Sequence, residues 1–135
     1  MGRKTGKGCY VYSGEKGERP INTAATEIFK RHALEPNKAV SEDLDIQQRL
    51  VVRFVNEAAL CLQDGILATP LEGDIGAVFG LGFPPMRGGP FRFVDYMGAQ
   101  NVVDIMRKYE AVYGPAFTPC QTLVDLGKAG GKFYK

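Results

Sequence analysis

Residues 75–98 read IGAVFGLGFPPMRGGPFRFVDYMG, and this stretch decides the fold. It contains six of the 17 glycines, three of the eight prolines and four of the eight phenylalanines of the chain. Glycine allows two backbones to approach closely and takes positive φ values, whereas proline fixes φ and ends helices. Large aromatic side chains beside both residue types predict a rigid, apolar elbow at which two helices meet.

The elbow is predicted at residues 82–91, between a helix that ends near Leu81 and a second helix that ends at Gly98. Glycine is common just after the end of a helix, and proline suits the first position of one. These preferences place the two helix ends on either side of the loop 83–89. The residues that form the elbow are Gly82, Pro84, Pro85, Gly89, Pro90 and Phe91.

A long helix over residues 41–65 is predicted to form the spine of the fold. Ser41 is the expected N-cap, acidic residues follow in the first turn, and apolar residues recur at helical spacing up to Gly65. Between the cap at Ser41 and Gly65 it has about 23 residues, which span roughly 34 Å at 1.5 Å per residue. A helix of this length crosses the whole domain.

Shorter helices are predicted before and after this long helix. Each has a helix-start signal or apolar residues at helical spacing. They cover residues 22–32 with Asn22 or Thr23 as cap, residues 70–81 with Thr69 and Glu72 as a capping box, residues 100–113, and a last segment from Pro119 with Thr118 as cap.

Three glycines, Gly73, Gly76 and Gly80, lie in the helix over residues 70–81. Each costs about 1 kcal/mol of helix stability relative to alanine. Close packing against the long helix is the expected compensation. Since no alternating β pattern is present, the fold class is all-α, a helical bundle around one long helix.

The composition limits the classes of protein to which the chain can belong. A length of 135 residues suits one domain. Residues 1–35 carry seven basic and four acidic groups, net +3, and residues 36–135 carry ten and eleven, net −1, which gives the total of +2. This charge is too small to indicate a nucleic-acid partner. No window of 18 apolar residues is present, so no transmembrane segment is expected.

The three cysteines, Cys9, Cys61 and Cys120, do not have the spacing of a metal site. Their odd number also does not indicate a set of disulfides. We therefore expect reduced thiols in a reducing compartment and no metal.

The string GLGFPPMRGGPFRFVDYMG, residues 80–98, resembles the C-terminal helical domain of the 3-hydroxyacyl-CoA dehydrogenase family. The longer stretch 46–135 resembles the end of the α-subunit of the mitochondrial trifunctional enzyme, an enoyl-CoA hydratase and 3-hydroxyacyl-CoA dehydrogenase of fatty-acid β-oxidation. The resemblance implies a fold like the C-terminal domain of 6-phosphogluconate dehydrogenase. It also implies that the chain is the second helical repeat, at the end of a longer multifunctional protein.

An internal echo supports two tandem repeats. The residues GKGCY at 6–10 are similar to GGKFY at 130–134, as expected if each marks the end of one repeat. The domain organisation that we predict is residues 1–12 as the tail end of a preceding helical repeat, residues 13–40 as a linker with a short helix, and residues 41–135 as the 3-hydroxyacyl-CoA dehydrogenase C-terminal helical domain.

No cofactor site is expected in this chain. A dinucleotide site needs a glycine-rich turn between a strand and a helix. Gly76, Gly80 and Gly82 do not have that spacing and follow no predicted strand, and Gly6 and Gly8 lack a third glycine. The resemblance implies that NAD binds a separate Rossmann domain upstream, in the parent protein.

No catalytic residue is expected either. The family's reaction uses a His–Glu pair, and this chain has one histidine, His32, on a short polar helix without a glutamate signature. An exposed surface histidine is the favoured interpretation of His32. The chain by itself is therefore predicted to be inactive as a dehydrogenase.

The resemblance implies three candidate substrate-binding residues, Gln48, Phe79 and Phe83. Gln48-Arg49 matches a family Asn-Arg pair but with glutamine in the place of asparagine, so a hydrogen bond on the helix surface or between domains is favoured for it. Phe79 matches an aromatic residue, often tyrosine, that contacts substrate in related enzymes. Without a hydroxyl, Phe79 would offer only apolar contact, and the alternative is a core phenylalanine beneath Pro84 and Pro85.

Five charged residues near the elbow and the long helix are interpreted as structural rather than catalytic. Asp74 lies in the first turns of its helix, where the helix dipole favours a negative charge. Arg92 and Asp95, three residues apart, are expected to pair on one helix face. The five residues are Glu57, Asp74, Arg87, Arg92 and Asp95.

The resemblance also implies the partners and the location of the parent protein. They are a long-chain acyl-CoA substrate, the preceding helical repeat, the Rossmann domain and a thiolase β-subunit, in the mitochondrial matrix. The chain would shape the acyl-CoA pocket and make subunit contacts. The alternative is a purely structural or oligomerisation module that docks through the elbow and does not touch substrate.

Overall fold

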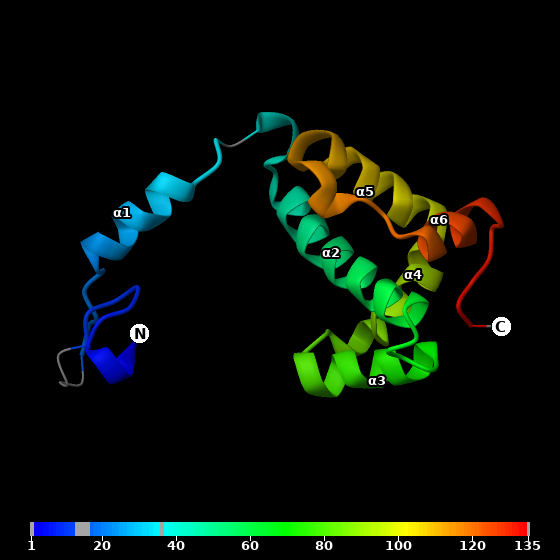
Figure 1. Ribbon diagram of the computed structural model, residues 1–135, viewed down its shortest axis with the longest axis horizontal. Helices are drawn as coiled ribbons and strands as arrows, with labels where there is room; N and C mark the ends of the chain where they lie inside the picture. The colour runs from blue at the N-terminus through cyan, green and yellow to red at the C-terminus, as the bar shows by residue number, and fades with distance from the viewer. Residues whose placement is uncertain (1, 13–16, 36, 135) are drawn as a thin grey trace. The chain divides into compact units, whose positions relative to one another are not determined.

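The computed structural model describes residues 2–12, 17–35 and 37–134 (Figure 1). The chain divides into two compact units, Met1–Pro36 and Asn37–Lys135. Residues 13–16 of the predicted linker lie outside the described residues. That residues 1–12 close a preceding repeat stays a prediction.

The first unit contains one turn of 3-10 helix, η1 (Arg3–Thr5), and the helix α1 (Thr23–His32). Helix α1 confirms the helix predicted over residues 22–32. Asn22 precedes it, but its side chain does not cap it, because Asn22 Nδ2 donates to the Gly8 carbonyl at 2.8 Å instead. None of the residues of α1 is buried.

The second unit is a bundle of helices around the long helix α2, which confirms the all-α prediction (Figure 1). Over the described residues of this unit, no helix is long and apolar enough to cross a membrane. Its elements are η2 (Lys38–Val40), α2 (Asp43–Gln63), α3 (Pro70–Leu81), η3 (Pro85–Arg87), α4 (Pro90–Met97), α5 (Ala99–Tyr113), η4 (Gly114–Phe117) and α6 (Gln121–Lys128).

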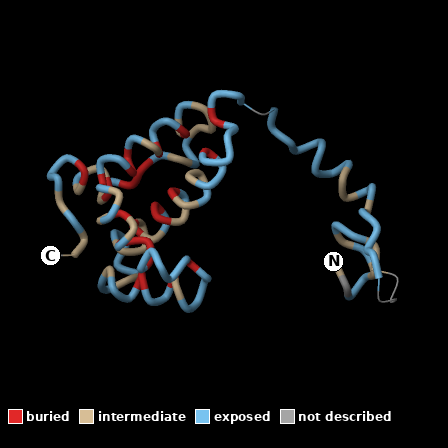
Figure 2. The backbone as a smooth tube through the Cα atoms, turned by 180° about the vertical axis from the view of Figure 1, so that it is seen from behind, coloured by how far each residue is buried: buried red, intermediate tan, exposed pale blue. Residues whose placement is uncertain are grey.

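The core of this unit lies where α2, α4, α5 and α6 meet, and Figure 2 shows the buried residues along their inner sides. Side chains three and four residues apart on each helix point into it, which is the pattern of an amphipathic helix. The largest fully buried side chains are those of Tyr109, Phe91, Met106, Leu123, Val40, Val52, Val55, Val94 and Val102.

The long helix begins one residue later than predicted. Ser41 is not the N-cap, because its hydroxyl donates to the Asn37 carbonyl and helps to close η2. The cap is Glu42, whose backbone N–H donates to Asp45 Oδ2 at 3.3 Å while the Glu42 side chain accepts from the third residue of the helix. The predicted Ser41 cap is therefore wrong.

The last helix also begins later than predicted. Thr118 does not cap it, because its hydroxyl donates to Glu110 Oε1. The buried side chain of Asn56, on α2, satisfies the backbone there instead. Its Oδ1 accepts from the Cys120 N–H at 2.8 Å, and its Nδ2 donates to the Thr118 carbonyl at 3.2 Å. A side chain distant in sequence thus sets the start of α6.

The capping box predicted for α3 is present, except that the Glu72 side chain accepts from the N–H of Ala68 rather than from that of the cap Thr69. Thr69 Oγ1 accepts from the Glu72 N–H at 3.3 Å, and Glu72 Oε2 accepts from the Ala68 N–H at 2.9 Å. The close packing predicted for the α3 glycines holds only for Gly73, where an added Cβ would lie 2.3 Å from Phe91 Cε2. This contact is with α4 rather than with α2.

The elbow has the predicted form. Gly82 ends α3 in the left-handed conformation, with φ of 77°, and Pro90 occupies the first position of α4. Gly89 has φ of 112°, and a Cβ there would lie 2.4 Å from Asp74 Oδ1. Only glycine fits this position, because both the conformation and the space exclude a side chain.

The buried side chain of Asp74 fixes the elbow through hydrogen bonds. Asp74 Oδ1 accepts from the Phe91 N–H at 2.8 Å while Oδ2 accepts from the Arg92 N–H at 3.3 Å. These two N–H groups lie in the first turn of α4, where they have no partner within the helix. Oδ2 also accepts from the Tyr134 hydroxyl at 2.6 Å. Asp74 therefore caps α4 and binds the C-terminal segment.

The C-terminal segment is held by α4 as well. Asp95 Oδ1 accepts from the Phe133 N–H at 2.7 Å, and Oδ2 accepts from the Tyr134 N–H at 2.9 Å. The Arg92 guanidinium lies 3.7 Å from the centroid of the Tyr134 ring. The predicted pair of Arg92 with Asp95 is wrong, because both side chains bind the segment that returns to α4.

Replacing Asp74 by alanine tests its role. Three donors lose a buried acceptor, so we expect Asp74→Ala to lower the free energy of unfolding by about 3 kcal/mol. Urea denaturation measures this change. The control is Asp104→Ala, which removes an exposed carboxylate on α5 and should change stability by less than about 0.5 kcal/mol. Equal effects of the two substitutions would contradict the capping role.

Candidate functional site

An apolar pocket of about 460 Å³ lies between the start of α2, the elbow, α4 and α5. We call it the elbow pocket. Most of its walls are aliphatic or aromatic, and glutamine and arginine side chains provide its polar groups. It is lined by Leu44, Gln47, Gln48, Val51, Val52, Phe83, Pro84, Met86, Arg87, Phe93, Met97, Val102 and Ile105.

Phe83 forms a fixed wall of the elbow pocket. Its side chain is buried, and its ring centroid lies 5.3 Å from that of Phe54 and 6.4 Å from that of Phe93. Aromatic rings at such distances stabilise each other in tilted and edge-on arrangements. The wall is therefore present before any ligand binds.

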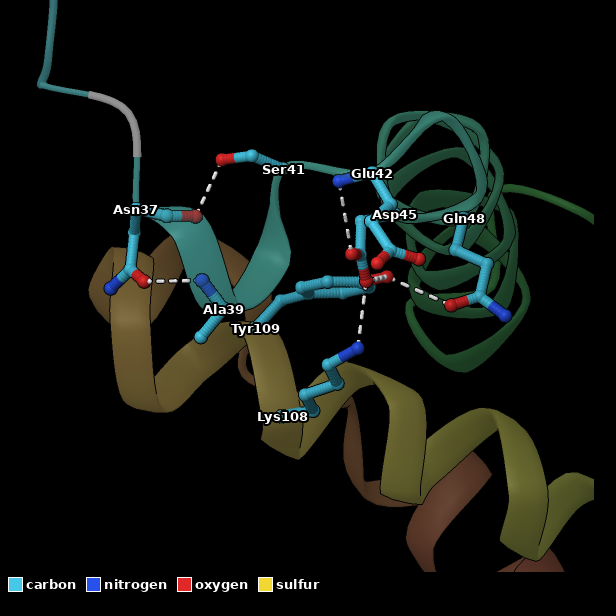
Figure 3. Close-up of polar contacts among 8 residues, drawn as sticks. All are labelled: Asn37, Ala39, Ser41, Glu42, Asp45, Gln48, Lys108 and Tyr109. Carbon is cyan, nitrogen blue, oxygen red and sulfur yellow. Dashed lines mark hydrogen bonds and ion pairs between the residues drawn. The ribbon is translucent and has the colours of Figure 1, made fainter.

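Gln48 lies on the same pocket and is the polar residue with the best-defined position. The Tyr109 hydroxyl lies 2.8 Å from Gln48 Oε1 and 2.9 Å from Asp45 Oδ1 (Figure 3). The amide nitrogen of Gln48 makes no hydrogen bond with the described residues. The single Tyr109 proton can go to only one of these two oxygens, so at least one of the two amide N–H groups of Gln48 is left for a ligand, whichever way its carboxamide is oriented.

Asp45 orders a polar cluster that consists of Asp45, Gln48, Lys108 and Tyr109. The carboxylate is buried and accepts from Lys108 Nζ at 2.7 Å, from Tyr109 and from the Glu42 N–H (Figure 3). The hydrogen bond from Lys108 holds the pKa of Asp45 below its ordinary value, against the opposing effect of burial. Asp45 is therefore ionised at neutral pH and keeps α2 and α5 in register.

Tyr109 stays protonated in this environment. Burial, together with the hydrogen bond to the Asp45 carboxylate, raises the pKa of Tyr109 to about 12. A neutral phenol is a donor rather than a base at physiological pH. This cluster accordingly positions Gln48 and does not supply a general base.

Phe79 lies apart from Gln48 and Phe83. It is on α3, does not line the elbow pocket and is 86% exposed. It is also not the core residue that the alternative interpretation required. Its ring is available to a ligand or to another surface.

Several residues of the cluster were not identified as site residues from the sequence. In the sequence, Asp45 belongs only to the acidic first turn expected for the long helix, and Tyr109 only to the helix expected over residues 100–113. Lys108 had no signal. Tyr109 is 64 residues from Asp45 in the chain, so no local pattern could have indicated their contact.

The catalytic and cofactor expectations can be compared with the geometry. His32 is exposed on α1, with no carboxylate bonded to it among the described residues. Gly76 and Gly80 lie within helix α3, and Gly82 ends it, so these glycines do not form a turn that leads into a helix. The described residues therefore do not fit an NAD site. They also contain no group of three side chains placed to hold a metal.

The fold and pocket define an all-α helical domain with an apolar pocket beside a glycine- and proline-rich elbow. Residues 46–135 match the family model described as 3-hydroxyacyl-CoA dehydrogenase, C-terminal domain. The match covers two thirds of the chain. The chain belongs to this family.

Similar curated proteins come from bacteria. The chain is 41% identical over 134 residues to the fatty acid oxidation complex subunit alpha of Shewanella loihica. The aligned region covers 99% of this chain and 18% of that protein. The chain is 43% identical over 133 residues to the protein of the same name from Vibrio vulnificus, with 98% and 18% covered. The chain thus spans about a fifth of the length of these relatives.

The expected mitochondrial location is wrong. It came only from the resemblance to a mitochondrial α-subunit, and the relatives found here are bacterial. Elbow motifs such as GFPP report the fold of a helical domain and carry no information about the compartment.

The pH dependence of stability tests the Asp45 cluster. The pKa of Asp45 is lowered on folding from its ordinary value of 3.8, so its ionised form stabilises the fold above that value. This contribution is lost as the pH falls through the folded-state pKa. We expect Asp45→Asn to be less stable than the native chain at neutral pH, with a difference that shrinks in acid.

Urea denaturation at neutral pH and at the lowest pH at which both chains fold measures this difference. The control is Asp104→Asn on the exposed face of α5. A stability difference for Asp45→Asn that does not change with pH would contradict the assignment of an ionised Asp45.

Proposed function

We propose that this chain is the C-terminal helical domain of a multifunctional β-oxidation enzyme. The longer protein would hydrate enoyl-CoA and oxidise 3-hydroxyacyl-CoA with NAD. Within it, this domain shapes the pocket for the acyl-CoA and contributes to contacts between subunits. The support is membership of the dehydrogenase C-terminal family together with relatives named as alpha subunits of a fatty acid oxidation complex.

The observation that carries a substrate role is the elbow pocket. Its volume of about 460 Å³ and its apolar walls suit a flexible hydrocarbon chain or the pantetheine arm of coenzyme A. Phe83 gives this pocket a rigid wall, and Met86 and Met97 are adaptable side chains that follow the shape of a ligand. Burial of apolar surface would provide most of the affinity.

Gln48 would orient the ligand. Its carboxamide is held beside the Tyr109 hydroxyl, and at least one of its two N–H groups can donate to a carbonyl oxygen of the thioester or of pantetheine. Asp45 and Lys108 fix Tyr109, and Tyr109 in turn fixes the glutamine. Gln48 is therefore proposed as a binding residue.

NAD would accept the hydride in the longer protein, bound to its Rossmann domain. The base that removes the proton from the 3-hydroxyl would also lie outside this chain, since His32 lies on an exposed helix and no carboxylate of the described residues binds it. The chain by itself is expected to bind acyl-CoA without oxidising it.

Partner contacts are proposed for the outer face of α3. Among the described residues outside their own helical turn, no atom lies within 4 Å of a Cβ built on Gly76 or Gly80, and Ile75 and Phe79 beside them are exposed. A face of this kind accepts a closely packed neighbouring helix. The preceding helical repeat is the proposed neighbour, and a thiolase β-subunit is a proposed partner of the longer protein.

A second candidate function is a structural or oligomerisation module without any substrate contact. The exposed apolar face of α3 favours it, because such a face is typical of a docking surface. In this case the elbow pocket would result from helix packing alone and would bind no substrate. Ligand binding distinguishes the two functions.

A calorimetric titration of the chain with a long-chain 3-hydroxyacyl-CoA, with NADH as the paired control, tests the proposal. We expect heat of binding for the acyl-CoA and none for NADH. No binding of either ligand would support the structural module. Binding of NADH would contradict the assignment of the cofactor site to another domain. The matched variant is Gln48→Ala, which should weaken acyl-CoA binding about 5- to 10-fold through the loss of one hydrogen bond.

Phe79→Ala tests whether this exposed ring contacts substrate. Because Phe79 is 86% exposed, its removal should change the free energy of unfolding by less than about 0.5 kcal/mol. A rise in the substrate KM of the longer enzyme, without a change in stability, is the result expected of a substrate contact. An unchanged KM would leave Phe79 as a packing residue of the α3 face.

A further inference from the structure

The residues that line the elbow pocket change in character from its floor to its mouth. The floor is formed by the buried side chains of Val52, Phe83 and Val102. The mouth is formed by exposed residues of the pocket lining, which are Leu44, Gln47, Pro84, Met86 and Arg87. An apolar floor excludes an ionic group, because a buried charge without a partner is costly. A ligand with one apolar and one charged end therefore enters the pocket with its apolar end first.

Among the described residues that line this pocket, Arg87 is the one with a charged side chain, and it lies at the mouth. Its guanidinium belongs to none of the ion pairs that the described part of the chain forms. It also donates no hydrogen bond to a described residue. A guanidinium carries a permanent positive charge and five N–H donors. The described residues thus leave a cation with free donors beside an apolar cavity.

The position of Arg87 is well defined. It ends the short helix η3, and its backbone N–H donates to the Pro84 carbonyl at 3.0 Å. Proline fixes φ, so Pro84 and Pro85 stiffen the backbone that carries the side chain. The guanidinium lies 5.8 Å from the centroid of the Tyr96 ring, within the range of a cation–π contact. An arginine held in this way loses less side-chain entropy when it binds an anion.

Gln48 indicates which anionic ligand the pocket suits. Its intermediate exposure places it between the buried floor and the exposed mouth, and at least one of its amide N–H groups is open to a ligand. The plain hydrocarbon chain of a free fatty acid would cover this N–H without accepting from it, which costs free energy. The pantetheine arm of coenzyme A has amide carbonyls that can accept, and it ends in phosphates. A CoA thioester therefore satisfies both Gln48 and Arg87.

We propose that Arg87 binds a phosphate of coenzyme A at the mouth of the elbow pocket, while the acyl chain lies on its floor. The proposal rests on the acyl-CoA function proposed above and adds the residue that recognises the coenzyme. The planar guanidinium matches two phosphate oxygens at once, and such charge-assisted pairs are among the strongest hydrogen bonds of proteins. Gln48 donates to a carbonyl group between these two ends of the ligand.

This orientation predicts a difference between two ligands that share one acyl chain. A 3-hydroxyacyl-CoA carries phosphates, and the matching 3-hydroxyacyl-pantetheine does not. An ion pair at the exposed mouth of a pocket is screened by salt. The affinity for the CoA thioester should therefore fall as the ionic strength rises, whereas the affinity for the acyl-pantetheine should change little.

Calorimetric titration of the whole chain and of Arg87→Gln with both thioesters tests the proposal. The variant loses a charge-assisted hydrogen bond, so it should bind the CoA thioester about 10-fold more weakly than the native chain does. It should bind the acyl-pantetheine as well as the native chain does. Arg87→Lys keeps the charge without the planar fork, so its affinity for the CoA thioester should lie between the two. The matched control is Arg107→Gln, which removes an equal charge from an exposed residue of α5 that does not line the pocket and should leave both affinities unchanged.

The outcomes separate this proposal from the function on which it rests. Circular dichroism must first show that each variant folds. If Arg87→Gln weakens the binding of both thioesters equally, or of neither, then Arg87 does not bind a phosphate, and the acyl-CoA function stands without it. If the native chain binds neither thioester, the proposed function itself is contradicted, and this proposal with it. A free fatty acid of the same chain length that binds more tightly than the CoA thioester, and no longer binds Arg87→Gln, would assign Arg87 to a carboxylate and overturn the proposal.

Discussion

The buried carboxylate of Asp74 is the interaction on which the rest of the second unit depends. It lies on α3, yet it accepts hydrogen bonds from the first turn of α4 and from the hydroxyl of Tyr134. An uncompensated carboxylate in this position would be costly, so these donors must stay in place together. The requirement also explains Gly89, since any side chain there would displace the carboxylate.

This constraint reaches the candidate site through the elbow. Once α4 is fixed against α3, the loop between them presents Phe83 to the rings of Phe54 and Phe93, and a wall of the elbow pocket follows. A second buried carboxylate, Asp45, organises the opposite side of the same pocket by positioning Gln48 through Tyr109. Two acidic residues thus determine the shape of an otherwise apolar pocket.

The parts of the fold that follow local rules could be predicted from the sequence. Gly82 and Pro90 mark helix ends by their own backbone preferences, and the periodicity of α2 indicates a long helix. Two predictions failed because a distant part of the chain intervened. Asn56 replaces Thr118 at the start of α6, and the segment at Tyr134 separates Arg92 from Asp95. Such contacts span about 40 to 60 residues, and no window of sequence contains both partners.

The central claim is that the elbow pocket binds the acyl part of the substrate. Chemical-shift mapping of the ¹⁵N-labelled chain with a long-chain 3-hydroxyacyl-CoA tests this claim most directly, because it identifies the residues that the ligand affects. The account predicts shifts that cluster at Gln48, Phe83, Phe93 and Ile105, which all line the pocket. Shifts confined to the outer face of α3, or none at saturating ligand, would contradict it.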